Sequence, residues 1–293
     1  MKSAKKQGIL TEIDLKKFKF KCVYYVMALI VFVTCLLVAI PAVWILLSGF
    51  KSPVEMYSTP VTFFPKSIDL RKLTASWNQM KFYKYYINTF ILAGGTTLFT
   101  LLISGFAGYV ISKLRPLGNG FLHAVIFWSM LIPSTMSTVP IYMSLIKTPL
   151  LGLNLSNSFV PLWFMGMDAF YIIMFKSFFD GISDSIIEAA NIDGAGKITT
   201  FFTIIIPMSL PVFMTVMIFS FNSSMASYFW PYLLITDSSK TVLGVQLFKM
   251  KSANFSLDYQ MLAIFFSIIP QILIFIFLQK NIVGGISTGA VKG

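Results

Sequence analysis

Charged side chains are scarce in this sequence. They make up 12% of its 293 residues, and only 11 of them are Asp or Glu, whereas soluble domains carry about 25% charged residues. Apolar residues make up 56% of the chain, and the mean hydropathy is +0.78. Several apolar runs reach the roughly 20 residues that are needed to cross a bilayer. The composition therefore excludes an ordinary soluble protein and predicts a polytopic membrane protein.

Residues that usually carry catalysis or bind metals are equally few. The single histidine, His123, excludes a histidine pair or cluster for zinc, and we interpret it as a polar residue at the level of the lipid headgroups. The two cysteines, Cys22 and Cys35, lie at the start of the first apolar run and inside it, which argues against a disulfide framework. The sequence thus predicts no catalytic, cofactor-binding or metal-binding residue in this chain.

A nucleotide-binding loop is also missing. The stretch from Asp193 to Lys197 resembles one, but a phosphate-binding loop needs glycine five residues before its last glycine and Ser or Thr after the lysine. Those positions hold Asn191 and Ile198. We therefore expect no ATP site in this chain.

The apolar runs predict six transmembrane helices in an all-α membrane protein. A polar, lysine-rich lead (residues 1–22) precedes a six-helix membrane domain (23–280) and a short tail (281–293). The net charge of +12 fits basic loops at lipid headgroups better than nucleic-acid binding, and the lysines before the first span place both termini in the cytoplasm. The expected spans are about 23–49, 88–112, 121–146, 158–179, 206–231 and 259–278.

Small residues mark the second expected span. It contains Gly94, Gly95, Gly105 and Gly108, which would let a neighbouring helix approach closely.

Residues 180–203 form a polar segment between two apolar runs, on the same side as the termini. Asp184, Glu188 and Asp193 supply three of the 11 acidic residues of the chain. Ser183 is placed to cap a short helix, Asp184 complements the helix dipole, and Gly194 is a natural left-handed stop. The pattern predicts a short surface helix followed by a sharp turn.

Two groups of polar residues in the expected spans admit two interpretations each. In the first interpretation, Asp168 contacts a substrate or a gate. In the second, it is a structural partner for a hydroxyl or a basic residue of another subunit. The polar and aromatic residues that end the fifth span suit sugar hydroxyls and ring faces, or else they hold helices together and mark the interface. These residues are Asn222, Ser223, Ser227, Tyr228 and Trp230.

With these residues in view, the chain resembles the membrane subunits of ATP-binding-cassette (ABC) importers, the family of binding-protein-dependent transport inner-membrane components. Within that family it resembles the carbohydrate branch, of the maltose type. The family signature is Glu-Ala-Ala, then Gly, then Ile-x-Leu-Pro. Its fuller form runs from Glu188 to Ala195, and Ile204 and Pro207 follow, with Ile206 in place of Leu. The C-terminal end is similar to that of maltose-type subunits.

The resemblance implies a type I ABC importer permease fold and a mechanism. The helix from Glu188 to Ala195 would be a coupling helix that docks on a separate ATPase subunit, and the C-terminal tail would reach toward that subunit. The residues concerned are Glu188, Ala189, Ala190, Asp193, Gly194, Ala195 and Pro207 for coupling, and Gly289, Val291, Lys292 and Gly293 for the tail.

The resemblance also implies partners. These are a second, homologous permease, two ATPase subunits that bind ATP and Mg, and an extracytoplasmic solute-binding protein that delivers a carbohydrate, in a bacterial cell membrane. Two places depart from the usual family pattern. Position 183 usually holds Pro and here holds Ser, and positions 225–227 usually hold Trp-Asn-Asp/Glu and here hold Met-Ala-Ser.

The alternatives to this importer are an ion-coupled carrier that uses Asp168 and, less supported, an intramembrane enzyme.

Overall fold

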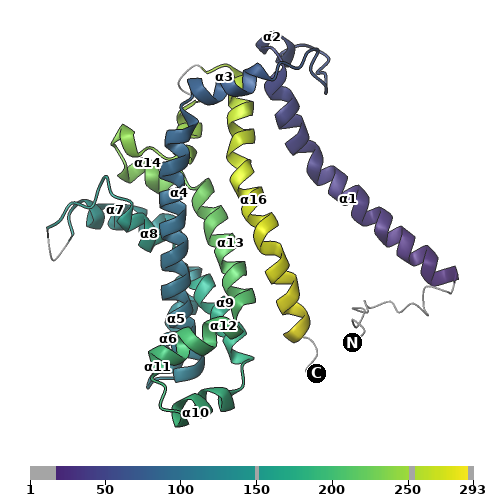
Figure 1. Cartoon of the computed structure of the whole chain (residues 1–293). Coiled ribbons are helices and arrows are strands. Elements are labelled where there is room, and N and C mark those ends of the chain that lie inside the picture. Colours follow the sequence, from purple (N-terminus) through teal and green to yellow (C-terminus); the bar gives the residue numbers. More distant parts are fainter. Residues whose placement is uncertain (1–17, 149–151, 251–254, 290–293) are drawn as a thin grey trace. The chain divides into compact units, whose positions relative to one another are not determined.

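The computed structural model of the chain describes residues 18–148, 152–250 and 255–289 (Figure 1). The described residues form helices and no strand, so the predicted all-α class is confirmed. The chain divides into two compact units. The first comprises the described residues up to Lys72 together with Ser256–Phe265, and the second comprises those in Leu73–Phe255 and from Phe266 onward.

Three of the described helices are long and apolar enough to cross a membrane. They are Lys21–Phe50, Phe82–Leu114 and Leu257–Gln279. Two further stretches meet the same test only as bent pairs, Asn119–Leu131 with Ser134–Ile146 (93°) and Lys197–Met208 with Leu210–Ala226 (85°). The described residues thus supply up to five candidate spans.

The expected span at 158–179 is divided into two helices. Helix α8 (Val160–Met165) and helix α9 (Ala169–Asp180) flank a break of three residues at Gly166. The count of six spans therefore stays a prediction. A proline explains one of the two bends, because Ile132 precedes Pro133 and takes the extended backbone that a following proline favours.

The first unit contains α1 (Phe18–Phe50), α2 (Pro53–Met56) and the start of α16 (Leu257–Gly289). Most large apolar side chains of α1 between Val23 and Val43 are exposed, as suits contact with lipid or another apolar partner. Polar contacts order the loop after α1: the Glu55 carboxylate accepts from the Lys66 N–H at 2.9 Å, and Lys72 pairs with Asp258 at 2.5 Å.

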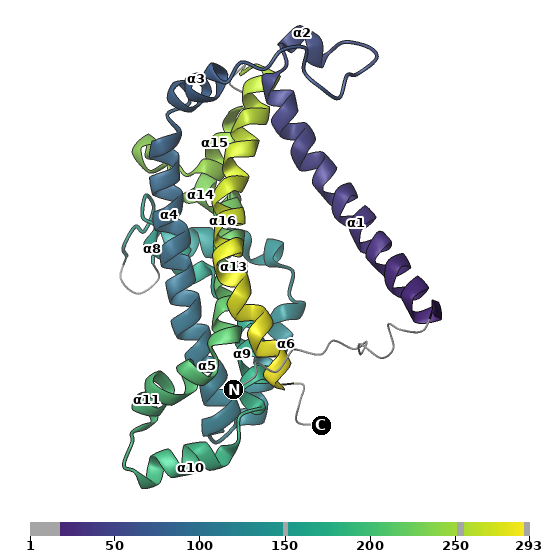
Figure 2. The same cartoon turned by 45° about the vertical axis from the view of Figure 1, so that its right-hand side comes forward.

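The second unit is built on two long helical elements, α4 (Phe82–Phe99) and α13 (Leu210–Ala226), which run side by side in Figures 1 and 2. Helix α4 continues through a π-helical turn (Thr100–Ser104), α5 (Gly105–Tyr109) and a second π-helical turn (Val110–Leu114). Helices α5, α9 and α13 enclose the main core with a third π-helical turn, η5 (Phe201–Ile205). Its largest buried side chains are Tyr109, Phe175, Phe179, Phe201 and Phe213.

The remaining helices of the second unit surround this framework. Part of α16 packs on α4 and α13 through Ile274. A second apolar cluster joins α4, α8 and α14 through Leu92, Leu162 and Leu234. The further helices are α3 (Arg71–Gln79, which spans the boundary between the units), α6 (Asn119–Leu131), α7 (Thr138–Ile146), α14 (Phe229–Leu234) and α15 (Leu243–Met250).

Three of the four glycines of the second expected span lie at close helix contacts. A methyl group added at Gly108 would lie 2.7 Å from Cβ of Phe175 in α9, one at Gly95 would meet Trp163, and one at Gly105 would meet Phe213 at 3.2 Å. Gly94 corrects the expectation, because no described atom lies within 4 Å of such a methyl group. Its position on the outer surface of α4 makes no close contact within this chain.

These contacts predict opposite effects for two alanine substitutions. Gly108→Ala would force α5 away from α9 and lower the stability by about 1–3 kcal/mol, as overpacking does. Gly94→Ala, the matched control, would gain about 0.5–1 kcal/mol because alanine favours the helix. Thermal midpoints of the purified variants in one detergent, followed by tryptophan fluorescence, test the pair. Equal midpoints would contradict the packing.

Candidate functional site

The polar segment at 180–203 contains the predicted short helix, α10 (Asp184–Ile192), at one end of the second unit, beside α5 and α11 (Lys197–Thr200) in Figures 1 and 2. Asp184 lies in its first turn as expected. The expected cap is wrong in its detail: Ser183 is the N-cap residue, but its side chain makes no capping bond. Its hydroxyl instead lies 2.7 Å from the hydroxyl of Ser185.

The end of α10 is a glycine stop of the Schellman type. Gly194 has φ +80°, a backbone conformation that glycine adopts without strain. The Ala195 N–H donates to the Ala190 carbonyl at 2.9 Å, and the Gly194 N–H donates to the Asn191 carbonyl at 3.1 Å. This pair of bonds satisfies carbonyls that the helix end would leave free. The predicted left-handed stop is confirmed.

A buried lysine anchors the start of α10. Lys113, in the π-helical turn after α5, has a side chain that is only 1% exposed. Its ammonium group donates to the Asp184 carboxylate at 2.6 Å and to the Ile182 carbonyl at 2.5 Å. Arg115 adds a second, more exposed contact to the same carboxylate at 3.2 Å. The sequence predicted Asp184 at the helix start but not this pairing, because the partners lie about 70 residues apart.

The anchor keeps the Asp184 carboxylate charged. The hydrogen bond from Lys113 and the positive charge of that lysine hold the pKa of Asp184 below its ordinary value of 3.8. A depressed pKa means that the contact contributes stability at every pH above the ordinary value, and that this contribution is lost as the pH falls through the lowered one.

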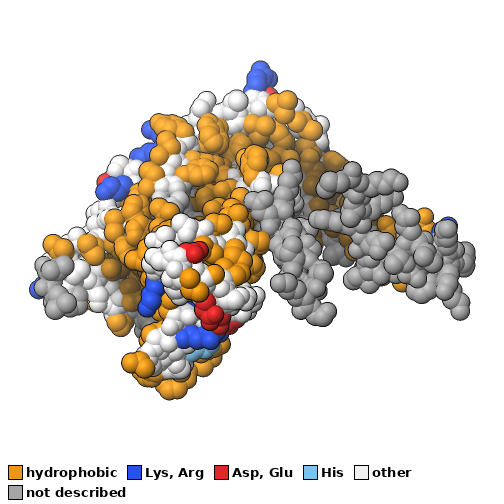
Figure 3. Space-filling model, turned by 60° about the horizontal axis from the view of Figure 1, so that its bottom comes forward, with side chains coloured by type: hydrophobic (Ala, Val, Ile, Leu, Met, Phe, Trp, Pro, Cys, Tyr) orange, Lys and Arg blue, Asp and Glu red, His pale blue; other side chains and the backbone are white. Residues whose placement is uncertain are grey.

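Helix α10 has one packed face and one exposed face. Ile186 and Ile187 pack on the main core, and Ala190 is buried. Glu188 and Ala189 are exposed, and Ile192 is 86% exposed. Figure 3, which views the end of the molecule that carries α10 in Figure 1, shows acidic, basic and hydrophobic side chains next to one another on this surface. The exposed face thus combines a carboxylate with uncovered apolar area.

The chain after α10 returns into the core. Asp193 is exposed at the helix end, and α11 leads into η5, which buries Phe201 and Ile205. Pro207 lies in the short helix α12 (Ile206–Met208) that follows. The Gly194 turn is therefore joined to the main core by a short, helical stretch of chain.

Asp168 has a structural role in this chain. Its carboxylate caps α9, accepting from the Phe170 N–H at 2.8 Å, and the residue is exposed. Helix capping by aspartate satisfies a free amide at the helix start. This capping bond was not predicted. The two interpretations of Asp168, a contact for a substrate or gate and a partner for a hydroxyl or a basic residue of another subunit, stay predictions.

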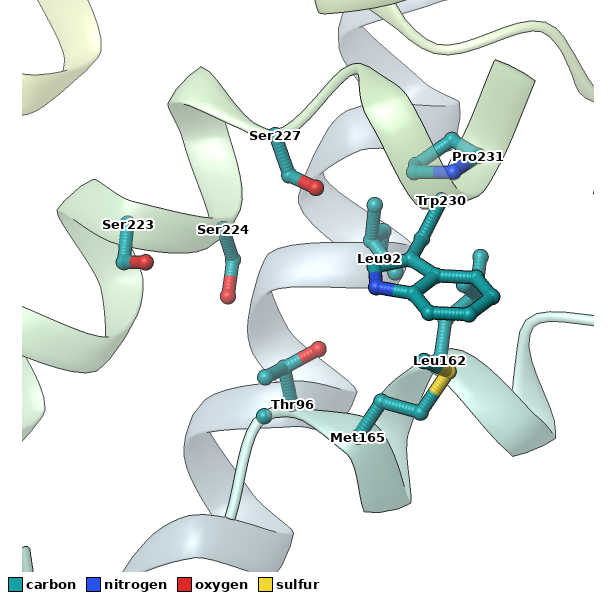
Figure 4. Close-up of a pocket in the computed structure, with 10 residues that line it drawn as sticks. Leu92, Thr96, Leu162, Met165, Ser223, Ser224, Ser227, Trp230 and Pro231 are labelled. Atoms are coloured by element: carbon teal, nitrogen blue, oxygen red, sulfur yellow. The ribbon is translucent and has the colours of Figure 1, made fainter. Parts of the chain in front are cut away.

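Three of the five predicted residues at the end of the fifth span meet at a cavity of about 190 Å³. Ser223 and Ser227 line it from α13 and its end, and Trp230 lines it from α14. Figure 4 shows the lining residues, to which α4 adds Thr96 and α8 adds Met165. The sequence analysis missed Thr96, which was hidden within an apolar span.

The other two predicted residues lie elsewhere. Tyr228 is exposed and stacks on Phe248 with ring centroids 5.3 Å apart. Asn222 is not among the residues that line the cavity, and its Oδ1 is buried without a hydrogen-bond partner in the described part of the chain.

The C-terminal prediction is only partly covered by the structure. Helix α16 continues as far as Gly289. The remaining predicted tail residues, Val291, Lys292 and Gly293, lie outside the described residues, as does the lead at 1–17.

Comparison with known proteins agrees with the resemblance. The profile of the family "binding-protein-dependent transport system inner membrane component" matches residues 101–288, which is more than half of the chain. The diacetylchitobiose uptake system permease protein NgcG of Streptomyces coelicolor is 27% identical over 87% of this chain and 85% of its own length. The melibiose/raffinose/stachyose import permease protein MelC of Bacillus subtilis is 27% identical over 78% of this chain and 83% of its own length.

A solved structure shares the fold. A chain of the crystal structure of a bacterial ABC transporter involved in the import of the acidic polysaccharide alginate superposes with a TM-score of 0.74 at 22% identity, over 90% of this chain and 98% of that chain. The predicted ABC importer permease fold is therefore confirmed. The matched family is a transport component, so the prediction of a transport subunit in place of an enzyme is confirmed, and the comparisons do not support the ion-coupled alternative.

The anchor predicts that Lys113 holds α10 in place. Lys113→Met would leave the Ile182 carbonyl without its buried donor, a loss of about 1–3 kcal/mol, and would leave the exposed Asp184 carboxylate to water. Backbone amides of 182–192 would then exchange hydrogen about tenfold faster or more. Arg115→Met, the control, removes an exposed contact of at most about 1 kcal/mol. Equal exchange rates in the two variants would contradict the anchor.

The lowered pKa of Asp184 predicts a pH dependence. Asp184→Asn should lower the thermal midpoint relative to the unsubstituted chain by a constant amount between pH 8 and pH 5, and the difference should shrink only when the pH falls below the ordinary pKa of 3.8 toward the lowered pKa. Midpoints measured in one detergent across that range test this. A difference that already disappears between pH 7 and pH 5 would show that another group controls the segment.

Proposed function

Because this chain belongs to the family of binding-protein-dependent transport system inner membrane components, we propose that it is the permease subunit of an ATP-driven importer for a carbohydrate. Support for the substrate class comes from the relatives. They include permease proteins for diacetylchitobiose, for melibiose, raffinose and stachyose, and for arabinooligosaccharides. An oligosaccharide is the substrate that this set favours.

The proposal includes the partners that such a system needs. A second, homologous permease completes the pore, two ATPase subunits bind ATP and Mg, and an extracytoplasmic binding protein delivers the sugar. The chain lies in a bacterial cytoplasmic membrane with both termini in the cytoplasm, and its C-terminal residues Gly289, Val291, Lys292 and Gly293 reach toward the ATPase. No cofactor is assigned to this chain itself.

One observation carries the coupling role: α10 is firmly attached to its own unit yet leaves a face uncovered. The Lys113–Asp184 contact and the buried Ala190 fix the helix on one side. Glu188 and Ile192 remain exposed on the other. A rigid element with an open, partly apolar face suits docking to a separate protein. We assign this face to the ATPase subunit, with Glu188 paired to a basic residue there.

Such a helix can transmit a movement between subunits. ATP must bind the closed pair of ATPase subunits better than the open pair in order to shift their equilibrium. Ala189, Asp193, Gly194 and Ala195 complete the docking helix and its turn, and Pro207 lies where the chain re-enters the spans. Closure then moves α10 together with the core to which it is anchored, and access through the pore alternates.

The coupling role predicts the effects of substitutions in the turn and on the exposed face. Glu188→Ala removes the proposed ion pair. Gly194→Asp places a side chain on a backbone with φ +80° and a negative charge at the C-terminal end of α10, where the helix dipole opposes it. Both should reduce sugar uptake and transport-coupled ATP hydrolysis at least about tenfold, while the chain still inserts.

Gly196→Ala is the matched control, because Gly196 has φ −67° and an added methyl group meets only the Thr199 hydroxyl, at 4.0 Å. Uptake should be unchanged in this variant. Normal uptake in both Glu188→Ala and Gly194→Asp would remove the coupling role from α10.

A further inference from the structure

The cavity at the end of α13 gathers hydrogen-bonding groups without charge. In Figure 4 the hydroxyl groups of Thr96 and Ser227 and the indole nitrogen of Trp230 point into one space, and the Ser224 hydroxyl lies beside it. These groups come from two segments of the chain that are far apart in the sequence, α4 with Thr96 and the stretch from Ser224 to Trp230. All lie in the second unit.

Hydroxyl groups between helices often serve only to hold the helices together, and some near the cavity do so. Ser224 donates to the Ser220 carbonyl at 2.8 Å, and Ser220 donates to Thr100 at 3.3 Å. Thr96, Ser227 and the Trp230 N–H differ, because they make no side-chain hydrogen bond within the described part of the chain. Their hydrogen-bonding capacity is therefore open to a ligand.

The position of the cavity fits a transport path. Thr96 lies near the middle of the candidate span Phe82–Leu114, and the residue is only 5% exposed. Polar groups at that depth are costly in a membrane unless they have a partner or a watery path. A substrate that passes this level would find donors and acceptors there.

The lining also indicates the chemical class of the ligand. None of the described residues that line the cavity carries a charge, so nothing there would compensate an anionic or cationic group after it leaves water. A hydroxyl group can both donate and accept a hydrogen bond, so the hydroxyls of Thr96 and Ser227 match the neutral hydroxyls of a ligand. The side chains of Leu162, Met165 and Trp230 offer an apolar wall to the face of a ring.

The size sets a limit on the occupant. About 190 Å³ is available, which is less than the roughly 300 Å³ of a small drug-sized pocket. The cavity therefore suits one sugar ring, and the rest of an oligosaccharide would lie outside it.

We propose that this cavity is a subsite of the permease for one neutral sugar ring, held by the Thr96 and Ser227 hydroxyls and the Trp230 N–H. The proposal rests on the carbohydrate importer proposed above and specifies its substrate class. A neutral ligand distinguishes this chain from some similar proteins, because the relatives and the solved neighbour include transporters for sn-glycerol 3-phosphate and for an acidic polysaccharide. The oligosaccharide would pass the subsite ring by ring.

Uptake kinetics test the subsite in cells in which the native gene is replaced by variants. The probes are radiolabelled raffinose, melibiose, trehalose and diacetylchitobiose as neutral sugars, and an alginate trisaccharide and sn-glycerol 3-phosphate as anions. Trp230→Phe keeps the ring and removes the N–H, and it should raise KM for the transported neutral sugar about fivefold with little change in Vmax, as expected for one lost hydrogen bond. Adding Ser227→Ala should bring the rise above about tenfold. Ser129→Ala, whose hydroxyl bonds the Ile126 carbonyl in α6, is the control and should leave KM unchanged.

A labelling experiment places the sugar directly. With Cys22 and Cys35 replaced by serine, Ser227→Cys provides a single thiol at the cavity, and Ser129→Cys provides one elsewhere. The intact transporter is treated with N-ethylmaleimide in the presence of each sugar. The transported neutral sugar should slow labelling of Ser227→Cys at least about threefold and leave Ser129→Cys unaffected, which also covers the case in which a kinetic variant fails to fold.

The outcomes separate the two proposals. Neutral-sugar uptake with unchanged KM in the Trp230 and Ser227 variants, or without protection of Ser227→Cys, overturns the subsite and leaves the importer intact. Uptake of the anionic probes alone overturns the neutral class. A chain that supports no carbohydrate uptake, although it is inserted and associated with an ATPase, contradicts the proposed function itself and the subsite with it.

Discussion

The structure depends on one buried charge, the ammonium group of Lys113. It ties the end of the α4–α5 element to the start of α10 through Asp184 and the Ile182 carbonyl. A buried amine needs such partners, because removing it from water without them costs several kcal/mol. The surface helix is thereby attached to helices that run through the core. Without this contact, α10 would be connected to the spans mainly through Ile186, Ile187 and the Gly194 turn.

Two regions of the same unit thus serve different tasks. At the end that carries α10, aromatic side chains such as Phe175 and Phe213 pack tightly, and Gly108 lets α5 approach α9. Dense packing transmits movement because it has little room to deform. Around the cavity, by contrast, hydroxyl groups and an indole leave space. Helix α13 borders both regions, so under the proposed coupling role it would carry a movement of α10 to the cavity.

The sequence predicts the parts of this structure that depend on local chemistry. The Gly194 stop, the surface helix around Glu188 and most of the close glycine contacts follow from residue type and spacing, and the structure contains them. Two features join segments that are distant in the sequence, and only the folded chain shows them. They are the Lys113–Asp184 contact and the cavity that Thr96 and Trp230 line together. The helix-capping bond of Asp168 was missed because the span expected at 158–179 was unbroken, so no helix start was expected there. Gly94 shows the same limit, since spacing alone does not say which face of a helix has a neighbour.

The most direct test of the central claim, that the exposed face of α10 docks on an ATPase, is a crosslink from Ile192. A tagged chain with Ile192→Cys, and with Cys22 and Cys35 replaced, is treated with a thiol-reactive photocrosslinker in its native cell, purified in mild detergent and analysed by mass spectrometry. The account predicts a crosslinked peptide from a protein with a nucleotide-binding loop, and loss of that crosslink in Glu188→Ala. Recovery of the chain without an ATPase, together with sugar uptake that follows an ion gradient after ATP is depleted, would contradict it.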